Sequence, residues 1–340
     1  MLYKREIWLD LIKGIVIICV VFEHAYESVN NYMPWESIGL NVLSECIKTF
    51  QMALFFSVSG YLYREKEQAK MRKGNFKDIK RYIYIKFTDL LVPYTIFGCL
   101  IWIGKLLFSQ WVKYQVGWKD LVMMYIKPIS FAWFLYALFL YEVVLVFIDF
   151  FVKKNVITSI ALSLLCLLIA CGQVTSEANV DKVLYYGFFY VLGTLIAGKS
   201  WVNNKLQGLI GLLLYIIFFV LYYLNKSCVL LFAICGVLAV IIVFGFMGKV
   251  EFSHSGINRL IGFIGAQSLY IYIIHPIIQH GLRAIFVMLG YMEGIVWLIE
   301  LTVAGVCIPL FYYVMSKKLQ MLSLPFKPRH YFERMKEMEE

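Results

Sequence analysis

Apolar runs of about 20 residues recur along almost the whole chain, and this repetition restricts its fold more than any other feature. Of the 340 residues, 61% are hydrophobic and only 16% are charged, a balance that is foreign to soluble domains. A helix of about 20 apolar residues crosses the hydrocarbon core of a bilayer and satisfies its own backbone hydrogen bonds there. We therefore expect an all-α, polytopic bundle of membrane-spanning helices.

The apolar runs predict about ten membrane-spanning helices. Their expected positions are 7–26, 45–63, 83–108, 131–152, 155–171, 183–198, 206–225, 228–247, 262–285 and 294–315. Residues 1–316 then form one membrane domain, and residues 317–340 form a short cytoplasmic tail. Neither this tail nor the polar segment 64–82 is long enough to fold alone.

The basic residues are distributed unequally between the two sides of the predicted bundle. With a cytoplasmic N-terminus, 23 of the 32 Lys and Arg residues fall in cytoplasmic segments and 6 fall in outer segments. Lys and Arg favour the cytoplasmic side of a membrane, so we expect both termini in the cytoplasm and a multi-pass protein of the plasma membrane. The net charge of +10 follows from this bias and does not indicate nucleic-acid binding.

The first predicted span carries polar residues that are costly in lipid. Asp10, Lys13 and His24 recur at nearly whole helical turns and share one face, with about 21 Å of rise between Asp10 and His24. Intramembrane charges usually serve a function. Glu27 follows His24 on the same face and is suitably spaced to orient the imidazole. The alternative is that these residues only anchor the two ends of the span in the membrane interface.

Polar residues also mark two other spans and one loop. Ser59 lies in a run of small residues that permits close helix approach. His275 precedes Pro276 in the ninth span, where a neutral imidazole needs a partner inside the bundle, with packing alone as the alternative. The loop from Arg64 to Lys86 holds nine basic residues, which suit either anionic lipid headgroups or a phosphorylated cosubstrate. The cysteines show no metal-ligand spacing with a histidine, and no metal site is predicted.

Five short motifs follow one another along nearly the whole chain. They are Arg5, Asp10, Lys13 and His24; Phe55-Phe-x-x-Ser-Gly-Tyr61; Leu91-Val-Pro-Tyr94; Trp133-Phe-Leu135; and Ser268-Leu-Tyr-Ile-Tyr-x-x-His275. In this order they resemble the acyltransferase family 3 membrane proteins, which include fucose 4-O-acetylase-like enzymes that acetylate surface glycans. Members of that family have about ten helices, in agreement with the hydropathy pattern.

The resemblance implies transfer of an acyl group, usually acetyl, from cytoplasmic acyl-CoA to a sugar hydroxyl of a surface or lipid-linked glycan. It also implies that His24 is the catalytic histidine, with Arg5 and Asp10 as its polar partners. Acyl-CoA is then a cosubstrate, and no permanently bound cofactor is expected. Members often carry Arg where this chain has Lys13 and Arg near the position of Asp89, so the cation that holds the CoA phosphates is open.

Site roles follow from the resemblance and from the chemistry of the residues. A sugar hydroxyl needs a base at neutral pH, and histidine suits this task. Whether His24 acts only as a base or also carries the acyl group is open. We assign catalysis to His24, Asp10 and Glu27. We assign CoA binding to Arg5, Lys13, Lys80, Arg81 and Lys86. We assign the substrate path to Ser59, Trp133, Tyr272 and His275.

The two substrates are expected on opposite sides of the membrane. With a cytoplasmic N-terminus, His24 lies near the outer end of the first span, whereas Asp10 and Lys13 lie near the inner end. The expected partners are therefore acyl-CoA from the cytoplasm, a glycan or lipid-linked saccharide from outside, and membrane lipid. The acceptor and the oligomeric state are open.

The main alternative is a transporter or glycan flippase whose intramembrane charges line a pathway. Against it, no pair of Gly- or Pro-broken spans recurs in corresponding halves of the chain. The other type of membrane acyltransferase, with Asn and His far apart, fits less well because Asn258 precedes His275 by only 17 residues. A catalytically inactive receptor is the third alternative.

Overall fold

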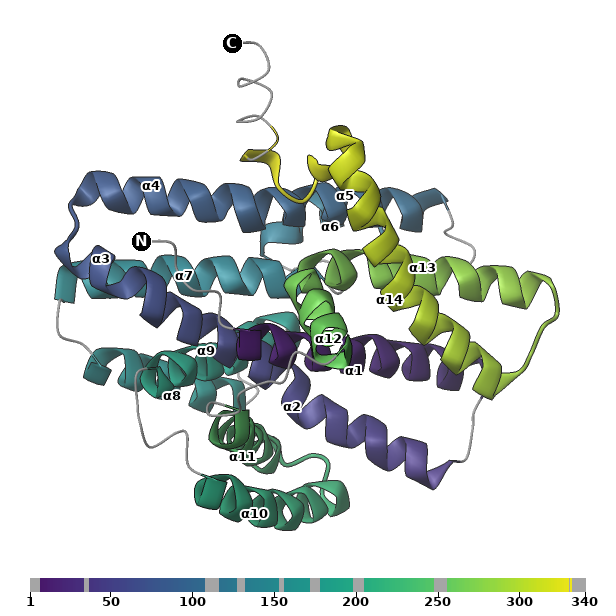
Figure 1. Cartoon of the computed structure of the whole chain (residues 1–340), viewed down its shortest axis with the longest axis horizontal. Helices are drawn as coiled ribbons and strands as arrows, with labels where there is room; N and C mark the ends of the chain where they lie inside the picture. The colour runs from purple at the N-terminus through teal and green to yellow at the C-terminus, as the bar shows by residue number, and fades with distance from the viewer. Residues whose placement is uncertain are drawn as a thin grey trace. The chain divides into compact units, whose positions relative to one another are not determined.

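The computed structural model describes residues 7–33, 37–107, 116–126, 132–152, 156–171, 178–197, 205–247, 256–329 and 331. These residues form helices and connecting turns, with no strand among them (Figure 1). The expected all-α class is therefore confirmed. The chain divides into two compact units, Met1–Tyr61 with Leu195–Phe311, and Leu62–Thr194 with Tyr312–Glu340.

The first unit combines helices from both ends of the chain. Its helices are α1 (Ile7–Tyr32), most of α2 (Ile38–Tyr63), α10 (Lys205–Leu224), α11 (Val229–Met247), α12 (Gly256–Ala266), α13 (Ser268–Met288) and most of α14 (Gly294–Lys318). Helix α1 packs against α12 and α13, and α10 packs along α11 (Figure 1). The N-terminal helix is thus held by helices that follow it by more than 200 residues.

The second unit holds the middle of the chain. It contains α3 (Ala69–Lys73), α4 (Phe76–Lys86), α5 (Val92–Leu107), α6 (Trp118–Val122), α7 (Trp133–Val152), α8 (Val156–Cys171) and most of α9 (Ala178–Ile196). A capping box starts α4, because the Asn75 side chain accepts from the amides of Lys77 and Asp78 while the Asp78 carboxylate accepts from the Asn75 amide. A π-helical segment, Phe87–Leu91, joins α4 to α5, so the span expected from residue 83 begins at Phe76 instead.

Among the described residues, six helices are long and apolar enough to cross a membrane. They are Phe76–Leu107, Trp133–Val152, Lys205–Leu224, Val229–Phe246, Ser268–Met288 and Gly294–Lys318. Helix α10 leaves large apolar side chains such as Leu213 and Leu224 exposed, as expected for a helix that faces lipid. The polytopic membrane character is confirmed, whereas the count of ten spans and the cytoplasmic location of both termini stay predictions.

The span expected over 262–285 is wrong as a single helix, because it is interrupted at Gln267. This residue, with φ −107° and ψ 15°, separates α12 from α13. The break lets α12 cross α1 with the two backbones in contact. A Cβ atom added to Gly265 would lie 1.7 Å from the Asp10 carbonyl oxygen, and one added to Gly14 would lie 2.1 Å from the Ile261 carbonyl oxygen. The crossing therefore requires glycine on both helices.

This crossing makes Gly265→Ala a sharp test of the packing. Alanine favours a helix over glycine by about 1 kcal/mol, but the added methyl group clashes with α1, and such overpacking costs about 1–3 kcal/mol. We expect a lower thermal midpoint in detergent than for the wild type. Gly262→Ala is the matched control on the same helix, because its added Cβ meets only a Leu11 methyl group at 4.0 Å. Equal midpoints for the two variants would contradict the backbone contact.

Candidate active site

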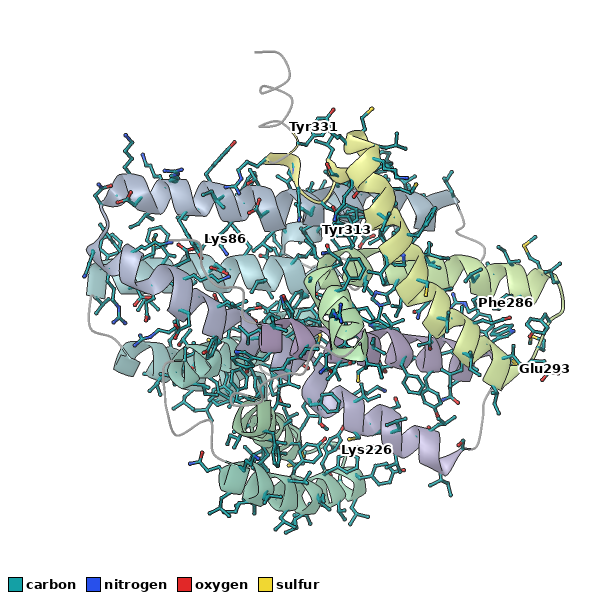
Figure 2. All side chains as sticks on the ribbon, in the orientation of Figure 1. Lys86, Lys226, Phe286, Glu293, Tyr313 and Tyr331 are labelled. Atoms are coloured by element: carbon teal, nitrogen blue, oxygen red, sulfur yellow. The ribbon has the colours of Figure 1, made fainter. Side chains whose placement is uncertain are left out.

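An apolar cluster in the first unit holds the end of α1 that carries His24. Ala25, Tyr26 and Val29 of α1 are buried against a set of residues from α14: Trp297, Leu298 and Leu301. Phe286 of α13, labelled in Figure 2, packs against the same cluster. The burial of this side of α1 sets the rotation of the helix about its axis and so the directions in which its polar side chains point.

The ammonium group of Lys48 on α2 lies next to three carboxylates, those of Glu23 and Glu27 on α1 and of Glu45 on α2. The Nζ atom of Lys48 lies 3.5 Å from Glu23 Oε1, 3.4 Å from Glu27 Oε1 and 3.6 Å from Glu45 Oε1. We call these four residues the Lys48 cluster. Glu23 is only 3% exposed, so its carboxylate depends on this partner. Lys226 approaches Glu45 to 3.9 Å at the edge of the cluster (Figure 2).

His24 lies between the Lys48 cluster and a second histidine. Its Nδ1 atom is 3.7 Å from Glu23 Oε2, which is close enough for charge attraction but longer than a hydrogen bond. Its ring centroid is 5.5 Å from that of His275, with the planes inclined by 33°. The Tyr272 ring lies 6.2 Å from that of His275. The structure thus brings together His24, Glu27, Tyr272 and His275, four of the predicted site residues.

His275 is fully buried where three helices meet. Its Nδ1 atom lies 2.7 Å from the Ile271 carbonyl oxygen, one turn back on α13. One turn further on, Gln279 donates from Nε2 to the carbonyl oxygens of Val21 on α1, at 2.9 Å, and Leu301 on α14, at 3.3 Å. The Gln279 side chain thus links α13 to the backbones of α1 and α14, one helical turn from His275.

The donor atoms of Glu23, His24 and Glu27 lie within 4.8 Å of one another, a spacing that a cation ligand set would also show. The Lys48 ammonium group already lies next to both carboxylates and supplies the positive charge that they need. A further cation would be repelled by this group. The arrangement therefore suits proton transfer at an imidazole better than metal ligation.

Asp10, Lys13 and Ser59, the other predicted residues described in the first unit, make contacts away from His24. Asp10 forms an ion pair with Lys13, with 2.7 Å between Oδ1 and Nζ, and is separated from His24 by about 21 Å of helix. Ser59 donates to the Phe55 carbonyl oxygen at 2.9 Å, a local bond within α2. Arg5 lies outside the described residues.

The predicted CoA-binding cations Lys80, Arg81 and Lys86 belong to the second unit and differ in their surroundings. Lys80 and Arg81 are exposed on α4, where the Lys80 ammonium lies 5.1 Å from the Phe76 ring centroid. Lys86, labelled in Figure 2, instead reaches Glu142 of α7, with 3.0 Å between Nζ and Oε1. Trp133, also in this unit, is buried with its ring 5.5 Å from that of Tyr186.

Two buried carboxylates of α7 were not predicted from the sequence. Asp149 accepts from Tyr63, Gln68 and Arg72. Glu142 accepts from Tyr82 and Lys86. The two acids are seven residues apart on one face of an apolar span, and this spacing was the available signal. These hydrogen bonds hold the basic segment Arg64–Lys86 against α7. Lys48 was not singled out either, although it lies within the predicted span 45–63 and belongs to α2.

The acyltransferase domain of acyltransferase family 3 matches residues 6–314 of the chain. No curated protein and no solved structure matches the chain.

The Lys48 cluster yields a stability test that does not depend on activity. Lys48→Met removes the partner of the buried Glu23 carboxylate, so we expect a clear loss of thermal stability in detergent. Glu23→Gln combined with Lys48→Met removes both charges and should recover much of that loss, giving a coupling energy of about 0.5–3 kcal/mol. Additive effects in this double-mutant cycle would show that the two groups do not stabilise each other.

Proposed function

Because the chain belongs to acyltransferase family 3 and is a membrane acyltransferase, we propose that it moves an acetyl group from cytoplasmic acetyl-CoA to a sugar hydroxyl. The acceptor is a surface or lipid-linked glycan. The observation that carries this proposal is the placement of His24 next to a buried carboxylate, Glu23, and a buried imidazole, His275.

His24 acts as the base in this proposal. As the hydroxyl oxygen forms the new C–O bond to the acetyl carbon, the proton of that hydroxyl moves to His24 and the C–S bond to CoA breaks. His24 then returns the proton to the CoA thiolate, so the imidazole is regenerated. Glu23, whose Oε2 lies 3.7 Å from His24 Nδ1, stabilises the imidazolium formed between these events.

The CoA phosphates are assigned first to Lys80 and Arg81. Both side chains are exposed, and the carboxylates of α7 do not engage them, whereas Lys86 is paired with Glu142. A free cation gains more from a phosphate than one that must first leave a carboxylate. Arg5, Lys13 and Lys86 stay in the proposed donor set as further sources of positive charge.

The acceptor is proposed to reach His24 from the side opposite to acetyl-CoA. The polar groups around His24 are mainly carboxylates, since Glu23, Glu27 and Glu45 face one Lys48 ammonium group. Carboxylates accept hydrogen bonds from sugar hydroxyls, and they repel the negatively charged phosphates of CoA. This charge balance supports a hydroxyl-rich acceptor at the His24 end of α1.

His24→Ala tests the catalytic assignment directly. A missing base costs about 10²–10⁴-fold in rate, so a deletion strain that expresses this variant should lose the O-acetyl groups of its surface glycans, as measured by mass spectrometry. His280→Ala is the matched control, because His280 is an exposed histidine of α13 outside the proposed machinery. Near-normal acetylation by His24→Ala at equal protein level would reject the assignment.

Charge neutralisation tests the donor site. Lys80→Gln combined with Arg81→Gln should weaken acetyl-CoA binding by about tenfold or more, since each charge-assisted bond to a phosphate contributes about 1.5–3 kcal/mol. Isothermal titration in detergent measures the affinity. The control is Lys119→Gln combined with Lys182→Gln, which removes the same charge from two exposed lysines outside the Arg64–Lys86 segment. If both double variants bind acetyl-CoA equally well, the phosphates lie elsewhere.

A further inference from the structure

Arg283 of α13 is a partly buried cation that faces no carboxylate among the described residues. Its Nη1 atom donates to the Ser28 hydroxyl at 2.9 Å, and its Cζ atom lies 4.7 Å from the Tyr32 ring centroid. Four partly buried cations elsewhere in the described helices each face a carboxylate: Lys13, Lys48, Arg72 and Lys86. A guanidinium group in a membrane-spanning helix is costly without a counter-charge, so its presence calls for an anionic partner.

The two contacts of Arg283 hold its guanidinium group and leave most of its donors available. Ser28 accepts from one of the N–H groups, and the Tyr32 ring contacts the face of the group without using its edge. The remaining N–H groups have the planar, forked arrangement that binds two oxygens of a phosphate or a carboxylate. Because the group is held before a ligand arrives, binding costs less conformational entropy.

The guanidinium group lies one to two helical turns from His24. Ser28 follows His24 by four residues and Tyr32 follows it by eight, so they lie about 6 Å and about 12 Å further along α1. On α13, Arg283 follows His275, whose ring is 5.5 Å from that of His24, by eight residues. Helical side chains lean toward the N-terminus of their helix, which directs Arg283 back toward the two histidines. This spacing suits a ligand with a hydroxyl at His24 and an anionic group at Arg283.

The Lys48 cluster lies on a different side of α1 from Arg283. Glu27 and Ser28 are neighbours in the sequence, so their side chains diverge by about 100° around the helix. Glu27 faces Lys48 of α2 at 3.4 Å, whereas Ser28 faces Arg283 of α13. An anion at Arg283 is therefore kept apart from these carboxylates, whose charge Lys48 compensates in part.

Aromatic packing holds the end of α13 that carries Arg283. The ring of Phe286, one turn further along (Figure 2), lies 5.4 Å from that of Trp297 and 5.5 Å from that of Tyr291. The Trp297 Nε1 atom donates to the Tyr291 carbonyl oxygen at 2.9 Å, which ties α14 to the turn after α13. A cation on a helix end held in this way can fix the position of a ligand.

We propose that Arg283 binds an anionic group of the acceptor, a phosphate or a carboxylate, and so places a nearby hydroxyl at His24. The acceptor is then an acidic glycan or a lipid-linked saccharide phosphate. Arg283 is a binding residue in this scheme and takes no part in proton transfer. The inference rests on the proposed function, since it names the class of acceptor for the same site. A phospholipid headgroup carries the same oxyanion chemistry, and the test separates the two sources.

Saturation-transfer difference NMR of the protein in a neutral detergent tests the site without acetyl transfer. The probes are glucuronate and glucose 1-phosphate, with glucose as the uncharged match. The wild type should bind the anionic probes in preference to glucose, and Arg283→Gln should weaken their binding by about tenfold or more, because hydrogen bonds to charged groups are the strong ones. Arg283→Lys keeps the charge without the fork and should bind with intermediate affinity.

The matched control is Lys182→Gln, which removes one charge from an exposed lysine of α9 and should leave probe binding unchanged. Equal binding of glucuronate and glucose 1-phosphate to the wild type and to Arg283→Gln would overturn the inference. A wild type with no preference for these probes over glucose would overturn it too.

Nanodiscs distinguish the acceptor from a phospholipid headgroup. The same probes are offered to the protein in detergent and in nanodiscs of phosphatidylcholine and phosphatidylglycerol. Equal binding in both supports a site for an acidic sugar. Binding in detergent that is lost in the nanodiscs shows that a headgroup occupies Arg283, and this result would reject the acceptor assignment.

Kinetics supply a measurement that a purely structural defect would not reproduce. With radiolabelled acetyl-CoA and membranes of a deletion strain as the acceptor source, Arg283→Gln should raise the acceptor concentration for half-maximal transfer by about tenfold. The values of kcat and of KM for acetyl-CoA should stay within about twofold, since a lost anchoring contact weakens ground state and transition state alike. A lower kcat with an unchanged acceptor requirement would contradict the inference.

The binding and kinetic measurements separate the failure of this inference from that of the proposed function. A wild-type protein that transfers no acetyl group would reject the function, while the NMR measurement would still report whether anionic sugars bind at Arg283. Normal transfer by Arg283→Gln at every acceptor concentration would leave the function standing and overturn the inference alone.

Discussion

The structure depends on one constraint: a polar group inside an apolar helix bundle must find its partner within the protein. Lys48 meets this constraint for Glu23, and Arg72 and Lys86 meet it for the two carboxylates of α7. Each of these contacts joins two different helices. Each ion pair therefore compensates a buried charge at a place where two helices already pack together.

The same constraint explains the division of roles among the cations. In the second unit, the cations that α7 engages secure the basic segment, whereas Lys80 and Arg81 remain exposed. In the first unit, Lys48 compensates only part of the surrounding negative charge. The second unit thus keeps exposed positive charge, which the proposed anionic cosubstrate would need, and the first unit keeps carboxylate oxygens beside a histidine.

Close contact between helix backbones is the second feature on which the structure depends. Gly265, Gly14 and Gly305 allow helices to approach where any side chain would intervene. In lipid, where apolar side chains gain little from leaving the solvent, such close packing is a main source of helix association. At Gly305 this packing also brings the Val21 and Leu301 backbones within reach of Gln279. The Gln279 hydrogen bonds then fix the position of α13, and with it His275, relative to α1 and α14.

Much of this protein could be read from its sequence, because hydropathy and helical periodicity are local properties. The apolar runs predicted an all-α membrane bundle, and the order of five motifs pointed to acyltransferase family 3. His24 and His275 each stood out as a histidine in an apolar span. Asp10, Lys13 and His24 lie on one continuous helix, and the pairing of Asp10 with Lys13 agrees with the predicted distance of about 21 Å from Asp10 to His24.

Contacts between distant segments were decided only by the tertiary structure. His24 and His275 are 251 residues apart, and no helical period relates them; they meet because α13 packs on α1. The break at Gln267 was hidden because the sequence on both sides of it is apolar; it lies two residues after Gly265, which meets the α1 backbone. The partners of Glu23, Glu142 and Asp149 were also hidden from the sequence, because each of them lies on another helix. Burial demands a counter-charge, but the packing of the helices chooses which residue supplies it.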